Sequence, residues 1–304
     1  TICGRRSCMK VMRPMVNLSK RSAVDGRTIT LPVIFGEKIV LRILDKGNLT
    51  FDLASFGFEP KAQKDFMAAI ANPYGMVLVT GPTGSGKTTT LYSALSRVNG
   101  EDVNIMTAED PVEYNLHGIN QVQVRTEIGM SFAAALRAFL RQDPNIIMVG
   151  EIRDSETAEI ALRSALTGHL LLSTLHTNDS TSSLSRLMDM GIANFLVSST
   201  LLGVLAQRLT RKLCVHCKET TKLAPATAQE IGVPEDKMYF KAVGCKECDF
   251  TGYKGRQAIG ELFIVDDHVK EMMKNDFNDY QIREAMKKNG MKTIADKLKE
   301  MLLA

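Results

Sequence analysis

The chain has 304 residues, 44% hydrophobic and 24% charged, a composition that is typical of folded globular proteins and excludes a disordered chain. Its 38 basic and 34 acidic residues give a net charge of +4, which is too small to indicate nucleic-acid binding by itself. The longest apolar stretch, residues 195–206, is too short to cross a bilayer, so we expect no transmembrane helix. Because a single core stops growing near roughly 250 residues, the length predicts two domains.

The N-terminal region predicts a small cationic domain. Residues 1–50 hold 10 Lys and Arg against 3 Asp and Glu, whereas the rest of the chain holds 28 against 31. Residues 29–44 favour β-structure, with a turn at 35–38 before the β-branched run 39–44. The chain begins with Thr rather than Met, and we expect domains upstream of it. Residues 1–46 are therefore assigned to the end of a small domain.

Residues 47–60 contain three turn-forming glycine and proline positions and predict a linker. A larger domain is expected over residues 61–304, where apolar strands alternate with helical segments. This alternation predicts a mostly parallel sheet with helices on both faces, and hence an α/β fold. The expected strands are 76–80, 104–107, 146–149 and 170–174, and the expected helices are 61–71, 88–98, 131–141 and 155–166.

The sequence Gly-Pro-Thr-Gly-Ser-Gly-Lys-Thr at residues 81–88 matches the G-x-x-x-x-G-K-[ST] loop between a strand and a helix. Its glycines allow backbone N–H groups to surround phosphate oxygens, and the following helix directs its positive end at the same anion. Lys87 is expected to neutralise the β- and γ-phosphates of ATP, and the Thr88 hydroxyl to bind Mg²⁺. The candidate nucleotide-binding residues in this segment are Gly81, Pro82, Thr83, Gly84, Ser85, Gly86, Lys87, Thr88 and Thr89.

Two acidic positions follow expected strands, at the sheet edge where α/β folds bind ligands. Glu109 follows the strand 104–107, and Glu151 follows the strand 146–149. Glu151 is predicted to be a catalytic residue and a magnesium ligand, and Glu109 a second catalytic candidate; which of them acts on water stays open. Asp154 can equally be an acid at a helix N-terminus.

Two histidines flank the strand 170–174. His169 precedes it and is a candidate for nucleotide binding, although a lone histidine is more often structural. His176 follows the strand, where a residue that senses the γ-phosphate has to lie, and is the better candidate for a catalytic role.

Four of the six cysteines form two C-x-x-C pairs, Cys214 with Cys217 and Cys245 with Cys248. This spacing favours a closed, structural zinc site within a subdomain at 214–248. A redox pair needs only one C-x-x-C, and two disulfides need an oxidising compartment. The remaining pair of cysteines, at positions 3 and 8, is interpreted as free or buried thiols.

These motifs together resemble the type II/IV secretion ATPase family, and within it the type IV pilus assembly (PilB-like) ATPases. Residues 140–154 resemble the segment around the Walker B strand, 109–114 an Asp box and 167–179 a His box. The resemblance implies a hexameric cytoplasmic ATPase at the bacterial inner membrane. It implies a RecA-like P-loop ATPase domain, a smaller N-terminal PAS-like α+β domain and a zinc-binding C-terminal insertion.

The same resemblance assigns a catalytic role to Arg42, as an arginine that reaches the nucleotide. The family usually has two further strands and another such arginine between residues 27 and 30, where this chain has almost nothing. Either the PAS-like domain is shortened, or residues are missing from the sequence between these positions. The alternative is that Arg42 has no catalytic role and pairs with an acidic residue at the surface.

The preferred function is a motor that hydrolyses ATP and drives pilin polymerisation through an inner-membrane platform protein and other pilus machinery. A type II secretion ATPase is the nearest alternative; residues 252–262 resemble the pilus enzyme more. The tetracysteine site disfavours a retraction ATPase. A RecA-like nucleic-acid translocase is the alternative from another class, but with no Trp and 6% aromatic residues the chain lacks a base-stacking track, so direct nucleic-acid binding is not expected.

Overall fold

The computed structural model describes residues 25–44, 58–274 and 278–303, without the side chains of 25–29 and 41–44. The chain divides into two compact units, residues 1–50 and 51–304. The cysteines at positions 3 and 8, and most of the expected linker, lie outside the described residues.

The described part of the first unit is a β-hairpin. Strand β1 (Asp25–Val33) pairs antiparallel with β2 (Gly36–Leu44), and residues 34 and 35 form the turn between them. The turn is therefore tighter than the expected one at 35–38. Strand β1 runs without a break through the position where the resemblance implies two further strands.

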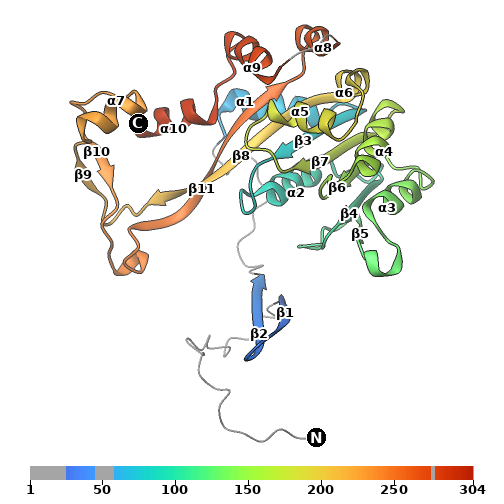
Figure 1. Cartoon of the computed structure of the whole chain (residues 1–304), viewed down its shortest axis with the longest axis horizontal. Helices are drawn as coiled ribbons and strands as arrows, with labels where there is room; N and C mark the ends of the chain where they lie inside the picture. The colour runs from blue at the N-terminus through green and yellow to red at the C-terminus, as the bar shows by residue number, and fades with distance from the viewer. Residues whose placement is uncertain (1–24, 45–57, 275–277, 304) are drawn as a thin grey trace, which may run out of the picture. The chain divides into compact units, whose positions relative to one another are not determined.

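The second unit is built on a seven-stranded sheet with the order β11-β8-β3-β7-β6-β4-β5 (Figure 1). All neighbouring pairs are parallel except β11 and β8, so the expected α/β fold with a mostly parallel sheet is confirmed. The strands are β3 (Gly75–Thr80), β4 (Ile105–Glu109), β5 (Asn120–Gln123), β6 (Ile146–Val149), β7 (Leu170–Leu175), β8 (Leu201–Leu213) and β11 (Tyr253–Ile264).

The central strands are buried on both faces, which explains their uninterrupted apolar sequences. Successive residues alternate between two cores: in β3, Met76 and Leu78 belong to one core, and Val77 and Val79 to the other. Apolar side chains along the helices complete each core, so the burial of both faces fixes the register of the sheet.

Helices cover both faces of this sheet. One core includes residues of α1 (Pro60–Ile70) and α2 (Lys87–Val98). The other includes residues of α3 (Phe132–Phe139), α4 (Ser155–Leu166), α5 (Ser182–Asp189), α6 (Asn194–Thr200), α8 (Asp267–Lys274) and α9 (Asp279–Lys288). The last described helix, α10 (Ile294–Leu303), contacts β11.

Strands β8 and β11 continue beyond the sheet as a long antiparallel ribbon (Figure 1). Near its end lie β9 (Glu219–Thr221), β10 (Tyr239–Lys241), α7 (Pro225–Ile231) and a 3₁₀ turn, η3 (Lys246–Cys248). Another 3₁₀ turn, η2 (Thr126–Ile128), lies in the sheet domain and precedes α3. The apolar stretch 195–206 is split between α6 and β8. Among the described helices, none has the length and apolar character needed to cross a membrane.

Candidate functional site

The loop of residues 81–86 joins the C-terminal end of β3 to the first residue of α2. Gly81, Gly84 and Gly86 all have positive φ angles, which glycine adopts without strain. A Cβ atom on Gly81 would lie 2.3 Å from the carbonyl oxygen of Gln207. The loop is therefore packed closely against β8, and a side chain at this glycine would displace it.

Gln207 braces the loop from β8. Its side chain donates a hydrogen bond to the Ser85 carbonyl at 2.8 Å and accepts one from the Thr90 hydroxyl at 2.7 Å. The glutamine is almost fully buried, so these two bonds are not exchanged with water. Sequence reasoning missed this residue.

The side chains of Ser85, in the loop, and Lys87, the first residue of α2, both offer donors that can bind an anion. The Lys87 ammonium donates to the carbonyl oxygens of Gly81 at 2.8 Å and Pro82 at 3.2 Å. Burial lowers the pKa of Lys87, and the charge of Glu151 partly opposes this effect. The buried Ser85 hydroxyl has no hydrogen-bond partner among the described residues. An unpaired buried hydroxyl is costly, and a bound phosphate oxygen would satisfy it.

Glu151 follows β6 and contacts His176, which follows β7, with 3.3 Å between a carboxylate oxygen and the imidazole Nε2. Its other oxygen accepts a hydrogen bond from Arg153, whose guanidinium also lies 3.6 Å from Asp110. Burial alone would raise the pKa of Glu151, but Arg153 and His176 outweigh it and the pKa is lowered. The structure thus brings Glu151, Lys87 and His176 to one edge of the sheet and keeps the carboxylate ionised.

Glu109 is placed differently. It is 3% exposed, and its oxygens accept hydrogen bonds from the hydroxyls of Tyr92 and Thr107 and from the side-chain amide of Gln121. The Tyr92 hydroxyl also accepts the backbone N–H of Glu113 at 3.3 Å. Glu109 therefore anchors the acidic loop that follows it, and its oxygens are already occupied. This arrangement favours a structural role over the expected catalytic one.

His169 is not brought to the site. It precedes β7, and the register pairs the start of β7 with Gly75 and its end with Thr80. Since the phosphate loop follows Thr80, His169 lies at the opposite edge of the sheet, about five residues of about 3.3 Å each away. Its imidazole contacts the Ser164 carbonyl at 3.1 Å. Within this unit His169 therefore lies away from the phosphate loop, and its expected role in nucleotide binding stays a prediction.

Asp154 caps α4: its side chain accepts a hydrogen bond from the Thr157 N–H at 2.7 Å. Of the two interpretations, the helix-terminal one describes this residue. Arg42 lies on β2 opposite Arg27, in the other unit, and its side chain is outside the described part. Its expected role stays a prediction.

The four cysteines of the two C-x-x-C pairs converge at the end of the ribbon, with all four Sγ atoms within 4.8 Å of one another. Three of the Sγ–Sγ distances are 3.8 to 3.9 Å, between Cys214 and Cys245, Cys217 and Cys248, and Cys245 and Cys248. Tetrahedral thiolates at a Zn–S distance of about 2.3 Å stand about 3.8 Å apart. Backbone N–H groups of Cys245 and Gly252 point at the Cys248 sulfur, 3.2 Å from it. The donor set therefore fits one zinc ion.

Comparison with known proteins gives a consistent family. The profile of the family described as Type II/IV secretion system protein matches residues 12–304. The type IV pilus assembly ATPase PilB of Myxococcus xanthus (strain DK1622) is 52% identical over 93% of this chain and 51% of its own length. The type II secretion system protein E of Pectobacterium carotovorum subsp. carotovorum is 52% identical over 82% of this chain and 50% of its own length.

Among solved structures, the pilus retraction motor PilT with bound ADP is similar with a TM-score of 0.62 and 26% identity, over 91% of this chain and 73% of that one. The chain spans about half the length of the two sequence relatives.

Proposed function

This chain belongs to the type II/IV secretion system protein family, and we propose that it is the motor portion of a cytoplasmic ATPase that drives type IV pilus assembly. One observation carries the proposal. A glycine-rich loop with an unpaired buried hydroxyl and a lysine lies beside an ionised carboxylate and a histidine at the same sheet edge. This set of groups suits phosphoryl transfer from ATP to water.

Each group has a proposed task. Backbone N–H groups of residues 83–89 and the Ser85 hydroxyl would hold the phosphates, and Lys87 would neutralise their charge. Thr88 and Glu151 would hold Mg²⁺, which supplies further charge neutralisation when it is bound. His176 touches Glu151 and is exposed enough to reach a terminal phosphate. Arg42 would contribute from the first unit when that unit closes on the nucleotide.

The wider assembly is likewise proposed. The second unit would be the RecA-like domain, and the hairpin of residues 25–44 the end of a shortened PAS-like domain. Six chains would form a ring at the inner membrane of a bacterium and act on a platform protein and other components of the pilus machinery. Four cysteines at the end of the ribbon would hold a structural zinc ion, which the sulfur spacing supports.

Type II secretion is the second candidate, because a relative named for that system is equally identical to this chain. The pilus relative matches a larger share of the chain, 93% against 82%. Deletion of the gene separates the two functions: loss of surface pili with normal enzyme secretion supports the pilus, and the reverse result supports type II secretion.

The activity itself is tested with two variants of the purified chain. Lys87→Ala should abolish phosphate release and weaken ATP binding, whereas Glu151→Gln should bind ATP without hydrolysing it. Exposed Lys64→Ala and Glu127→Gln are matched controls that should behave as wild type. Phosphate release within a few-fold of wild type in either site variant contradicts the assignment. A rate that rises strongly with DNA and falls steeply with salt favours a nucleic-acid translocase instead.

A further inference from the structure

The loop of residues 176–181, which we call the His loop, connects β7 to α5 and is bonded to the phosphate-loop strand. Thr80 is the last residue of β3, and its hydroxyl lies 2.6 Å from the hydroxyl of Thr177. The Thr80 hydroxyl also accepts the backbone N–H of Thr177 at 3.0 Å. The His loop, which begins at His176, is therefore fixed on its inner side directly before Gly81.

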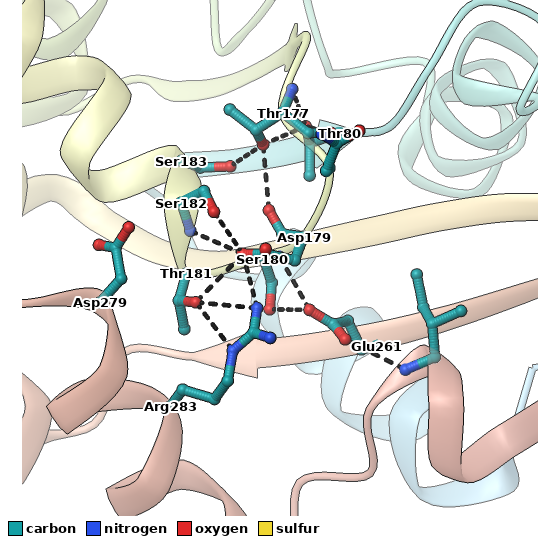
Figure 2. A network of polar contacts seen from close by, with 12 residues as sticks. Thr80, Thr177, Asp179, Ser180, Thr181, Ser182, Ser183, Glu261, Asp279 and Arg283 are labelled. Carbon is teal, nitrogen blue, oxygen red and sulfur yellow. Dashed lines mark hydrogen bonds and ion pairs between the residues drawn. The ribbon is translucent and has the colours of Figure 1, made fainter. Parts of the chain in front are cut away.

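The outer side of the same loop is held by residues from the C-terminal part of the chain (Figure 2). Asp179 forms an ion pair with Arg283 of α9 at 2.7 Å, and the same guanidinium donates to the Thr181 hydroxyl at 3.3 Å. Ser180 donates both its backbone N–H and its hydroxyl to Glu261 of β11, at 2.9 and 2.8 Å. Three consecutive residues of the loop thus have partners 81 to 104 positions further along the chain.

Glu261 joins two separate elements to the loop. Its second oxygen accepts the backbone N–H of Ile294, the first residue of α10, at 3.1 Å. The side chain is 3% exposed and pairs with no lysine or arginine in the part of the chain that the structure describes. A buried carboxylate is costly unless each oxygen is satisfied, so the loop and the start of α10 must both stay in place.

The Arg283 and Asp179 pair is a weak source of stability. Their side chains are 30% and 27% exposed, and both line an open pocket of about 650 Å³. An ion pair that water reaches contributes about 0 to 1 kcal/mol. Burial would raise the pKa of Asp179, but hydrogen bonds from Ser182 and the Arg283 charge outweigh it, so the pKa is lowered and the pair stays charged. A planar guanidinium that contacts two loop residues fixes a geometry more than it stabilises a fold.

We propose that Arg283 and Glu261 are positioning residues, which hold the His loop so that His176 stays against Glu151. The inference rests on the proposed function, because it assigns these residues to the same site. Neither residue touches the phosphate loop. Their effect passes through Asp179 and Ser180 to Thr177 and from there to the strand end at Thr80.

The experiment is a double-mutant cycle on the full chain. Arg283→Gln and Asp179→Asn each remove one charge, and asparagine keeps the oxygen that accepts the Ser182 N–H. Since a displacement of about 1 Å can cost about a hundredfold in rate, each single variant should lower kcat by about tenfold or more. The KM for ATP should stay within about twofold, because the phosphate loop is braced independently by Gln207.

The double variant should be no slower than the slower single variant, since both changes break the same ion pair between Asp179 and Arg283. Arg163→Gln is the matched control: it removes an arginine from an exposed 2.7 Å pair with Glu159 on α4 and should leave kcat unchanged. A wild-type kcat in Arg283→Gln, or effects that multiply in the double variant, would overturn the inference.

Hydrogen exchange supplies a readout that needs no turnover. Amides of residues 177–181 should exchange faster than in wild type in Arg283→Gln, at a melting temperature close to wild type, and in Glu261→Gln, where the loss of a bond to the buried carboxylate also lowers the melting temperature. Unchanged exchange in both variants would refute the positioning role. If the wild-type chain itself fails to hydrolyse ATP, the proposed function fails, while the exchange result still decides whether these residues hold the loop.

Discussion

Replacing Glu109 by Gln tests whether Glu109, at the end of β4, has a different role from Glu151, which follows the neighbouring strand β6. The substitution keeps the size and shape of the side chain and removes its charge. One Glu109 oxygen accepts from both Thr107, at 2.6 Å, and Gln121, at 3.1 Å, and the other accepts from Tyr92. A glutamine can keep the first oxygen in place and turn its NH₂ group toward the Tyr92 hydroxyl.

The cost of this change follows from the contacts. In the variant the introduced amide faces the Tyr92 hydroxyl as a donor, so the hydrogen bond from this hydroxyl to the charged carboxylate is lost. Loss of one buried hydrogen bond to a charged group costs about 1.5 to 3 kcal/mol. In a unit of this size, each kcal/mol of lost stability lowers the melting temperature by about 2 to 4 °C. The melting temperature should therefore fall by roughly 3 to 12 °C.

The expected activity is the opposite of that of Glu151→Gln. Because the buried Glu109 has its oxygens occupied by the protein, the folded Glu109→Gln chain should retain kcat within a few-fold, whereas Glu151→Gln should lose it. Phosphate release at about 25 °C and thermal unfolding of the same preparations measure both quantities. Tyr92→Phe is the companion variant, since it removes the same hydrogen bond from the other side and should show a similar loss of stability with turnover preserved.

A Glu109→Gln chain that melts like wild type but releases no phosphate would refute this reasoning. It would mean that Glu109 is exposed to the reaction in the working enzyme, contrary to its 3% exposure here. A loss of turnover that follows the fraction of unfolded chain, by contrast, agrees with an anchoring role for the Asp box loop.

The cysteines, Arg153 and Arg42 each give a further test. Elemental analysis should find one zinc per chain. Chelation should unfold the 214–248 subdomain, because structural zinc can contribute about 10 kcal/mol or more to folding. Purified protein that contains no zinc and melts unchanged after chelation would contradict this prediction. Arg153→Gln should move the acid limb of the kcat/KM profile to higher pH, since Arg153 lowers the Glu151 pKa against burial and its loss lets that pKa rise; an unmoved limb refutes it. Arg42→Ala should lower turnover by about 10³ with little effect on ATP binding, and activity recovered by mixing it with Lys87→Ala chains would show sharing between subunits.

Much of the sheet could be predicted from the sequence. The four expected strands appear within two residues of their expected limits, because a parallel strand buried on both faces needs an uninterrupted apolar run. The phosphate loop could also be predicted, because positive φ angles at three positions require its glycines. The sequence also placed Glu151 and His176 at the carboxyl ends of strands, and the structure brings them into contact.

The roles of other polar residues depended on partners far away in the chain. Gln207 contacts Ser85 across 122 positions, and Arg283 contacts Thr181 across 102, so no local pattern marks either residue. Glu109 is the last residue of β4 and was a catalytic candidate at the sheet edge, but its side chain is buried against Tyr92. His169 was the weaker of the two histidine candidates, and the register of β7 with β3 places it at the end of β7 away from the phosphate loop.

The ribbon of β8 and β11 ties these observations together. In its register Gln207 lies opposite Gly260, and Glu261 lies opposite Ala206, so Gln207 and Glu261 occupy neighbouring positions but point to opposite faces of the sheet. From one face Gln207 braces the phosphate loop, and from the other Glu261 holds the His loop. The same two strands lead outward to the four cysteines. One pair of strands therefore holds both loops of the proposed site and also carries the four cysteines.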